Sequence, residues 1–120
     1  MQEKSIKLKY CLYARKSSES DERQAMSIDS QIKEMLELAE RNSLEIVVTK
    51  EESHSAKDSG TRPIFREMLY ELKQGEYNGI LTWAPDRLSR NAGDLGSLVD
   101  MMDRGKLLHI KTNSQSFSND

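Results

Sequence analysis

The stretch Tyr10-Cys11-Leu12-Tyr13-Ala14-Arg15-Lys16-Ser17-Ser18 decides how this chain is organised. Apolar and polar residues alternate from Leu8 to Arg15, and a polar run follows at once. This pattern predicts a strand that ends in a loop. Because residues two apart share a face of a strand, Tyr13 and Arg15 should point the same way, with Ser17 next along the same line.

An arginine beside a hydroxyl at the carboxyl end of a strand is a candidate phosphate site with its own nucleophile. The guanidinium group matches phosphate oxygens, and a serine hydroxyl can attack phosphorus once it is activated. The simpler interpretation of this stretch is a strand terminus with a solvated Arg15 and two loop serines. The choice between a phosphate site and a solvated strand terminus depends on the rest of the sequence.

Composition limits the classes of protein that this chain can belong to. Its 120 residues are enough for one domain. The composition, with 32% charged and 36% hydrophobic residues, is typical of a globular protein. The net charge of −2 argues against binding nucleic acid mainly through bulk electrostatics. No window is apolar enough for a membrane span, no secretory signal is visible, and the single cysteine, Cys11, fits a reducing compartment. We therefore expect a cytoplasmic protein without a membrane partner.

Apolar residues at helical spacing predict three helices, from Met26 to Asn42, from Pro63 to Gly75 and from Asn91 to Arg104. Ser27 is the expected N-cap of the first, and Gly75 and Gly105 are the expected C-terminal caps of the other two. The residues expected on the buried faces are, in order, Ile28, Ile32, Met35, Leu36 and Ala39; Ile64, Phe65, Met68, Leu69 and Leu72; and Leu95, Leu98, Val99 and Met102.

Three more strands are expected at Glu45–Thr49, Ile80–Trp83 and Leu107–Ile110, with a polar loop from Glu51 to Thr61. Regular alternation of strands and helices predicts an α/β fold in three layers. Its mostly parallel sheet of four to five strands carries helices on both faces. Ligands of such sheets bind beyond the carboxyl ends of the strands. Residues 1–120 are expected to form one domain.

Three segments should converge on that edge of the sheet. The first carries Arg15 and Ser17, the second ends at Arg62 before a helix, and the third is the run from Asp86 to Arg90 with Arg87 within it. Four arginines and a hydroxyl would bind a phosphate, and the amides at the helix mouth at Pro63 should add donors. The alternative is ordinary ion pairing of each arginine with Asp86, Glu51 or Glu52.

Other chemistries find less support in the sequence. Neither a G-x-x-x-x-G-K-[ST] loop nor a G-x-G-x-x-G run follows the first strand, and two histidines and one cysteine in separate segments do not suggest a zinc site. Four arginines already supply the positive charge that phosphoryl chemistry needs, so no metal or other cofactor is expected. His109 should be a packed residue, His54 is a candidate general base, and Trp83 is expected in the core.

Four motifs in order resemble the catalytic domain of the serine site-specific recombinases, the resolvase/invertase family that includes large serine integrases and transposon recombinases. The resemblance runs from about Leu8 to the end of the chain. The motifs are Tyr13-Ala14-Arg15-Lys16-Ser17, Ser27-Ile28-Asp29-Ser30-Gln31, Ser55 with Thr61-Arg62-Pro63, and Asp86-Arg87-Leu88-Ser89-Arg90-Asn91.

This resemblance implies that Ser17 attacks a DNA phosphodiester, leaving a 5′-phosphoserine link and a free 3′-hydroxyl. Ser18 is the rival nucleophile, and the Y-x-R-x-S spacing favours Ser17. Glu51 stands where the family commonly has aspartate, and Ala56 where it often has glycine. The remaining implied roles are Arg15, Arg62, Arg87 and Arg90 as active-site arginines, Asp86 as the residue that orients them, and Tyr13, Gln31 and Ser55 as pocket residues.

The resemblance also implies partners. The substrate would be double-stranded DNA at recombination sites, and the whole protein would assemble into dimers and tetramers through a long helix followed by a DNA-binding region. The catalytic domain alone would then be monomeric or weakly associated, and inactive. Two alternatives stay open from the residues alone. A non-catalytic phosphate- or partner-binding α/β module is one, and a receiver-like domain is a weaker one because Arg15-Lys16 has the wrong charge for it.

Overall fold

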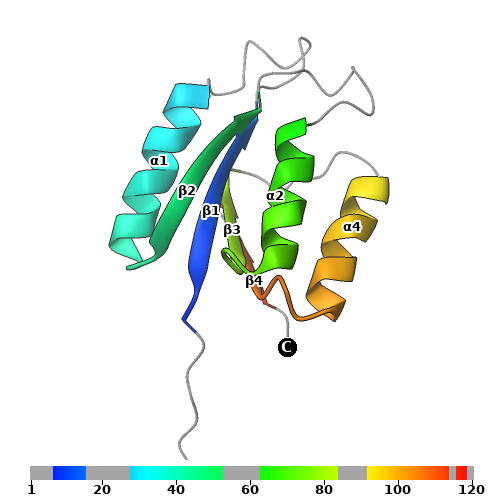
Figure 1. The fold of residues 1–120 in the computed structure, drawn as a ribbon. Coiled ribbons are helices and arrows are strands. Elements are labelled where there is room, and N and C mark those ends of the chain that lie inside the picture. The colour runs from blue at the N-terminus through cyan, green and yellow to red at the C-terminus, as the bar shows by residue number, and fades with distance from the viewer. Residues whose placement is uncertain (1–6, 16–27, 53–62, 84–91, 114–115, 119–120) are drawn as a thin grey trace, which may run out of the picture.

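A single sheet runs through the middle of the protein (Figure 1). The structure is a computed structural model, which describes residues 7–15, 28–52, 63–83, 92–113 and 116–118. Within these residues the strand order is β2-β1-β3-β4-β5. The parallel strands are β1 (Lys9–Arg15), β2 (Glu45–Glu52), β3 (Gly79–Thr82) and β4 (His109–Lys111), and β5 (Ser116–Ser118) pairs antiparallel with β4.

Helices cover both faces of this sheet. Helix α1 (Ile28–Arg41) lies on one face, and α2 (Pro63–Gln74) and α4 (Ala92–Asp103) lie on the other (Figure 1). The expected three-layer α/β fold with a mostly parallel sheet is therefore confirmed. None of the helices among the described residues is long and apolar enough to cross a membrane.

Strand β1 is the centre of two hydrophobic cores because both of its faces are covered. Its even-numbered residues Tyr10, Leu12 and Ala14 pack toward α1 in one cluster, which includes Met35. Its odd-numbered residues Cys11 and Tyr13 pack in the other cluster with residues of α2 and α4. Every residue of β1 after Lys9 is buried. Cys11 and Tyr13, which alternate with the more apolar residues in the sequence, therefore face a second layer of helices and not water.

Val47 is an extra residue in β2. In the pairing of β2 with β1, Ile46 lies opposite Tyr10 and Val48 lies opposite Cys11, so that Val47 has no partner. Such a bulge reverses the facing of the residues that follow it. Ile46 packs in the α1-side cluster, whereas Val48, two residues later, packs in the α2-side cluster.

The helix ends follow the expected chemistry. Gly75 and Gly105 follow α2 and α4 with φ of +83° and +75°, the left-handed conformation in which glycine is favoured. Helix α1 ends at Arg41, and the amide of Asn42 donates to the carbonyl of Leu38. The expected N-cap, Ser27, lies outside the described residues.

Two buried-face predictions were wrong. On α1, Leu36 is 45% exposed and Leu38 is buried in its place. On α4, Leu95 and Val99 are 55% and 47% exposed. Leu98 is buried as expected, and Met101 is the other residue of α4 that is buried against the sheet. Spacing shows that an apolar face exists, but the neighbouring elements select which of two overlapping faces is buried.

Strand boundaries also differ from the predictions. Strand β2 continues to Glu52, so the loop expected from Glu51 begins later. Strand β4 begins at His109, two residues after the expected Leu107. The polar tail contains a short edge strand, β5, because its backbone can pair with β4 even though its sequence has no apolar alternation.

Candidate active site at the carboxyl end of β1

The structure describes three of the residues proposed for the site, and brings them to one edge of the sheet. Arg15 is the last residue of β1, Tyr13 lies two residues before it, and Gln31 lies in the first turn of α1. The other proposed residues lie outside the described residues: Ser17, Ser55, Arg62, Asp86, Arg87 and Arg90, together with the alternatives Ser18 and His54.

The backbone at the end of β1 is held from both sides. The Gln31 side-chain amide donates to the carbonyl oxygen of Arg15 at 3.1 Å. The Thr82 hydroxyl, at the end of β3, donates to the carbonyl oxygen of Tyr13 at 2.7 Å. Gln31, Thr82 and Arg15 are fully buried, so these hydrogen bonds form away from water. Gln31 thus holds the backbone at Arg15, which precedes Ser17 by two residues in the sequence.

Glu52 has a role that the sequence did not predict, since it was named only as a possible ion-pair partner of an arginine. Its carboxylate is fully buried at the end of β2. The Tyr13 hydroxyl donates to Oε1 at 2.9 Å. In α2, the amide of Phe65 donates to the same oxygen at 2.8 Å, and the amide of Ile64 donates to Oε2 at 3.1 Å. One carboxylate therefore joins β1, β2 and the first turn of α2.

These hydrogen bonds correct one expectation. The helix mouth at Pro63 was expected to offer its amides to a bound anion, but the amides of Ile64 and Phe65 donate to Glu52. A carboxylate at a helix N-terminus satisfies orphan donors and interacts favourably with the helix dipole. The anion at this helix is thus a side chain of the protein.

Arg15 and Glu52 are paired in register across β1 and β2. Among the described residues they are the only charged side chains that are fully buried. Burying a charge costs free energy unless an opposite charge and hydrogen bonds compensate for it. Glu51, the neighbouring acid that the resemblance had singled out, is exposed.

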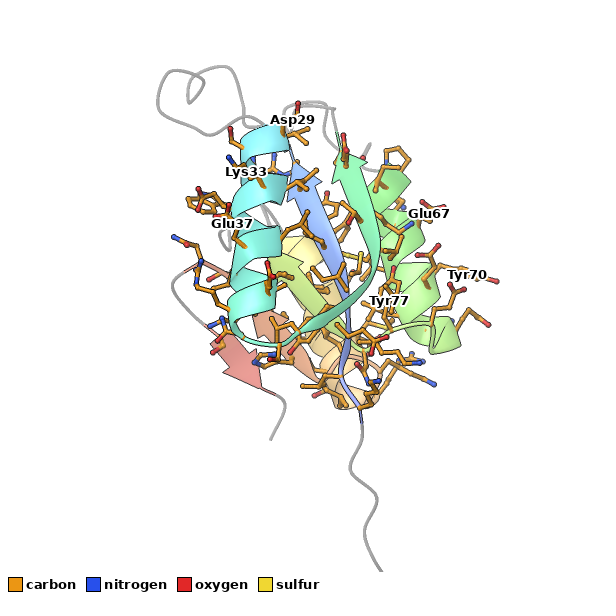
Figure 2. The ribbon with its side chains drawn as sticks, turned by 90° about the vertical axis from the view of Figure 1, so that its left-hand side faces the viewer. Asp29, Lys33, Glu37, Glu67, Tyr70 and Tyr77 are labelled. Carbon is orange, nitrogen blue, oxygen red and sulfur yellow. The ribbon has the colours of Figure 1, made fainter. Side chains whose placement is uncertain are left out.

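A second polar network joins β2 to α2 further from this edge. Lys50 Nζ lies 3.0 Å from Glu67 Oε1 and 3.1 Å from Glu71 Oε1, and Tyr77 donates to Glu71 at 2.6 Å. Burial alone would raise the pKa of Glu71, but the hydrogen bonds from Tyr77 and Lys50 lower it. Figure 2 shows Tyr77 beside α2, with Glu67 and Tyr70 on the helix's outer side.

The remaining candidates play structural parts in the described residues. Cys11 is buried, and burial raises the pKa of its thiol to about 12, so it is a poor nucleophile at neutral pH. His109 accepts or donates a hydrogen bond at Nδ1 with the Tyr10 hydroxyl, and the two rings are in edge contact, as a packed residue should be. Trp83 packs at the margin of the α1-side core, as expected.

The outer side of α1 is charged and carries nothing that resembles a site. Asp29, Lys33 and Glu37 follow one another at four-residue spacing along this side (Figure 2), and all three are exposed. Opposite charges at this spacing give modest support to a helix.

Comparison with known proteins identifies the family of this chain. Residues 10–119 match the resolvase N-terminal domain family. The chain therefore belongs to this family, and it is a catalytic domain of a site-specific DNA recombinase. The expected resemblance and enzyme class are thereby confirmed.

Solved structures show the same fold. The N-terminal catalytic domain of TP901-1 integrase matches with a TM-score of 0.71 and 22% identity over 87% of this chain and 75% of that one. A resolvase family site-specific recombinase from Streptococcus pneumoniae matches with a TM-score of 0.66 and 26% identity over 88% and 72%. The catalytic domain of ISC1926 TnpA, an IS607-like serine recombinase, matches at 0.69 and 16% over 90% and 71%.

Proposed function

We propose that Ser17 is the nucleophile of this recombinase domain. Its Oγ would attack a DNA phosphorus, forming a phosphoserine ester to the 5′ end while the bond to the 3′ oxygen breaks. The serine proton leaves to a base, and the 3′ oxygen gains a proton. Attack of another 3′-hydroxyl on the ester reverses these steps and joins the strands without an external energy source.

The arginines have the complementary role in this proposal. Arg15, Arg62, Arg87 and Arg90 stabilise the negative charge that develops on the phosphoryl oxygens and on the leaving oxygen, and Asp86 orients them. Ser55 belongs to the same pocket. The observation that carries the proposal is the position of Arg15, which is fully buried at the end of β1, two residues before Ser17.

The described pocket residues refine two of the roles. Gln31 acts by holding the Arg15 carbonyl, and Tyr13 acts through Glu52, to which its hydroxyl is bonded. We further propose that residues 1–120 form one catalytic domain that is monomeric or weakly associated on its own. Dimers and tetramers on double-stranded DNA would then depend on other parts of the full protein.

Covalent capture tests this function. The full gene product is incubated with sheared genomic DNA from its source, and DNA-linked protein is separated under denaturing conditions. The proposal expects protein attached to 5′ ends for the wild type and none for Ser17→Ala. A wild type that never becomes attached would overturn it, as would attachment that persists in Ser17→Ala.

A further inference from the structure

The part of β2 that follows Val47 contacts α2 at three successive inward-facing positions. Val48 packs in the α2-side core, Lys50 forms ion pairs with α2, and Glu52 accepts hydrogen bonds from its first turn. All three face α2 because the extra residue at Val47 reverses the facing of the strand. Without the bulge they would share the face of Ile46, toward α1.

Two of these contacts fix the position of α2 along its own axis. Glu52 is bonded to the amides of Ile64 and Phe65, and such free amides exist only in the first turn of a helix. Lys50 lies between Glu67 and Glu71, which are one turn apart. A slip of α2 by one turn would move it by about 5.4 Å, which would break the hydrogen bonds to Glu52 and cost Lys50 one of its two glutamate partners.

The same carboxylate ties α2 to the strand that carries Arg15. Tyr13 donates to Glu52, and Arg15 is the register partner of Glu52. Glu52 is fully buried and already accepts three hydrogen bonds, so it cannot reach DNA directly. Any effect of this residue on the reaction must pass through the groups that it holds.

We propose that Glu52, turned toward α2 by the Val47 bulge, is a positioning residue for DNA cleavage. It fixes the distance between the end of β1 and the start of α2, and this inference rests on the function proposed above. In the sequence Arg62 is joined directly to Pro63, the first residue of α2, so the position of α2 limits where that arginine can act. Arg15 lies opposite Glu52 in the neighbouring strand.

Precise spacing matters for this chemistry because groups that stabilise a transition state must be held in place before the reaction. A misplacement of about 1 Å can lower a rate by about 100-fold. A carboxylate that spans two elements and a helix end provides such a fixed spacing. We call Glu52 and the three groups that donate to it, the Tyr13 hydroxyl and the amides of Ile64 and Phe65, the clamp. The neutral amide of glutamine would present an N–H₂ group to these donors, which need acceptors, and the clamp would loosen.

The test compares two matched substitutions in the full gene product, Glu52→Gln and Glu51→Gln. They make the same chemical change at adjacent positions, one buried in the clamp and one exposed. Sheared genomic DNA is the probe, and the rate of covalent attachment is measured against DNA concentration and corrected for the folded fraction. Hydrogen exchange of the Ile64 and Phe65 amides reports on the clamp itself.

We expect Glu52→Gln to lower the rate at saturating DNA by about 10- to 100-fold, with the half-saturating DNA concentration changed less than about twofold. The Ile64 and Phe65 amides should also exchange faster, whereas Glu51→Gln should match the wild type in both readouts. A wild-type rate per folded molecule in Glu52→Gln, or unchanged exchange of both amides, would overturn the inference. If Glu52→Gln does not fold, Lys50→Met replaces it, because this substitution removes the ion pairs that also attach β2 to α2. The same reduction in rate is then expected, and a wild-type rate per folded molecule would overturn the inference.

The outcomes separate this inference from the function on which it rests. Attachment in the wild type and its loss in Ser17→Ala support the recombinase chemistry whatever Glu52→Gln does. If that result holds while Glu52→Gln cleaves at the wild-type rate, only the role of Glu52 is lost. If the wild type never attaches to DNA, both proposals fail.

Discussion

Arg15 and Glu52 lie opposite each other in neighbouring parallel strands, and both side chains are fully buried. They stand at the carboxyl edge of the sheet, where open α/β sheets bind their ligands. Glu52 accepts the hydrogen bonds from Tyr13 and from the first turn of α2. It therefore shapes the site, although it cannot contact the substrate. Glu52 faces these partners because Val47, a surface residue outside the site, bulges out of the pairing between β1 and β2.

Deleting Val47 should leave the facing of β2 intact, because Val47 has no partner in β1. The deletion would make Ile46 and Val48 neighbours, still opposite Tyr10 and Cys11 and still on opposite faces of the strand. We expect the free energy of unfolding to change by less than about 1 kcal/mol, as for most changes at surface positions. Urea denaturation measures it, with Val47→Ala as the control that keeps the bulge. A loss of about 3–5 kcal/mol, the cost of leaving a buried charge without its partners, would contradict the account.

Two glycines should respond in opposite directions to the same substitution. A Cβ at Gly79 would lie 2.7 Å from Cδ2 of Tyr10, so Gly79→Ala should destabilise the protein by about 1–3 kcal/mol. A Cβ at Gly96, inside α4, meets nothing within 4 Å, so Gly96→Ala should stabilise by about 0.4–1 kcal/mol. Thermal or urea unfolding of the pair provides the check, and equal effects at both sites would be inconsistent with the packing of Tyr10.

His109 should make stability depend on pH. Burial, and to a lesser extent Lys111, lower its pKa in the folded protein, whereas the unfolded chain has a pKa of about 6.5. The unfolded state then binds more protons, so stability should fall as the pH drops below about 6.5 and level off below the folded pKa. Urea unfolding at several pH values should show a smaller loss in His109→Gln than in the wild type. An identical loss in both proteins would rule out this residue as a cause.

Cys11 should be inert in the folded protein. Burial raises the pKa of its thiol to about 12, so the thiolate is scarce at pH 8. A thiol-reactive dye such as Ellman's reagent should label it at the rate of unfolding, and labelling should become fast in denaturant. Fast labelling of the native protein would show that the β1 core is open to solvent.

Much of the fold could be predicted from the sequence, because the period of apolar residues identifies helices and strands directly. The alternation around Tyr13 and Arg15 located β1, and Gly75 and Gly105 marked two helix ends. The burial of Leu38 over Leu36, and the exposure of Leu95, could not be predicted in the same way. These choices depend on how helices pack against neighbours far away in the chain.

Only part of the candidate site could be predicted from the sequence, for a related reason. Arg15, Tyr13 and Gln31 belong to short motifs, so a linear pattern could identify them. The role of Glu52 could not be predicted, because its facing depends on a bulge five positions earlier, and such a bulge has no signal in the hydrophobic pattern. A buried arginine at the end of β1 needs an acid nearby, but the burial of Arg15 is known from the structure and not from the sequence.

The central claim is that Ser17 forms the bond to DNA, and the most direct measurement is the identity of the attached residue. The DNA-linked protein is trimmed with nuclease and cut with trypsin, which should release the peptide from Ser17 to Arg23 with its three serines. Fragmentation in a mass spectrometer then locates the nucleotide phosphate. We predict that it is found on Ser17. A phosphate on Ser18 or Ser20, or an unmodified peptide from DNA-linked protein, would contradict the account.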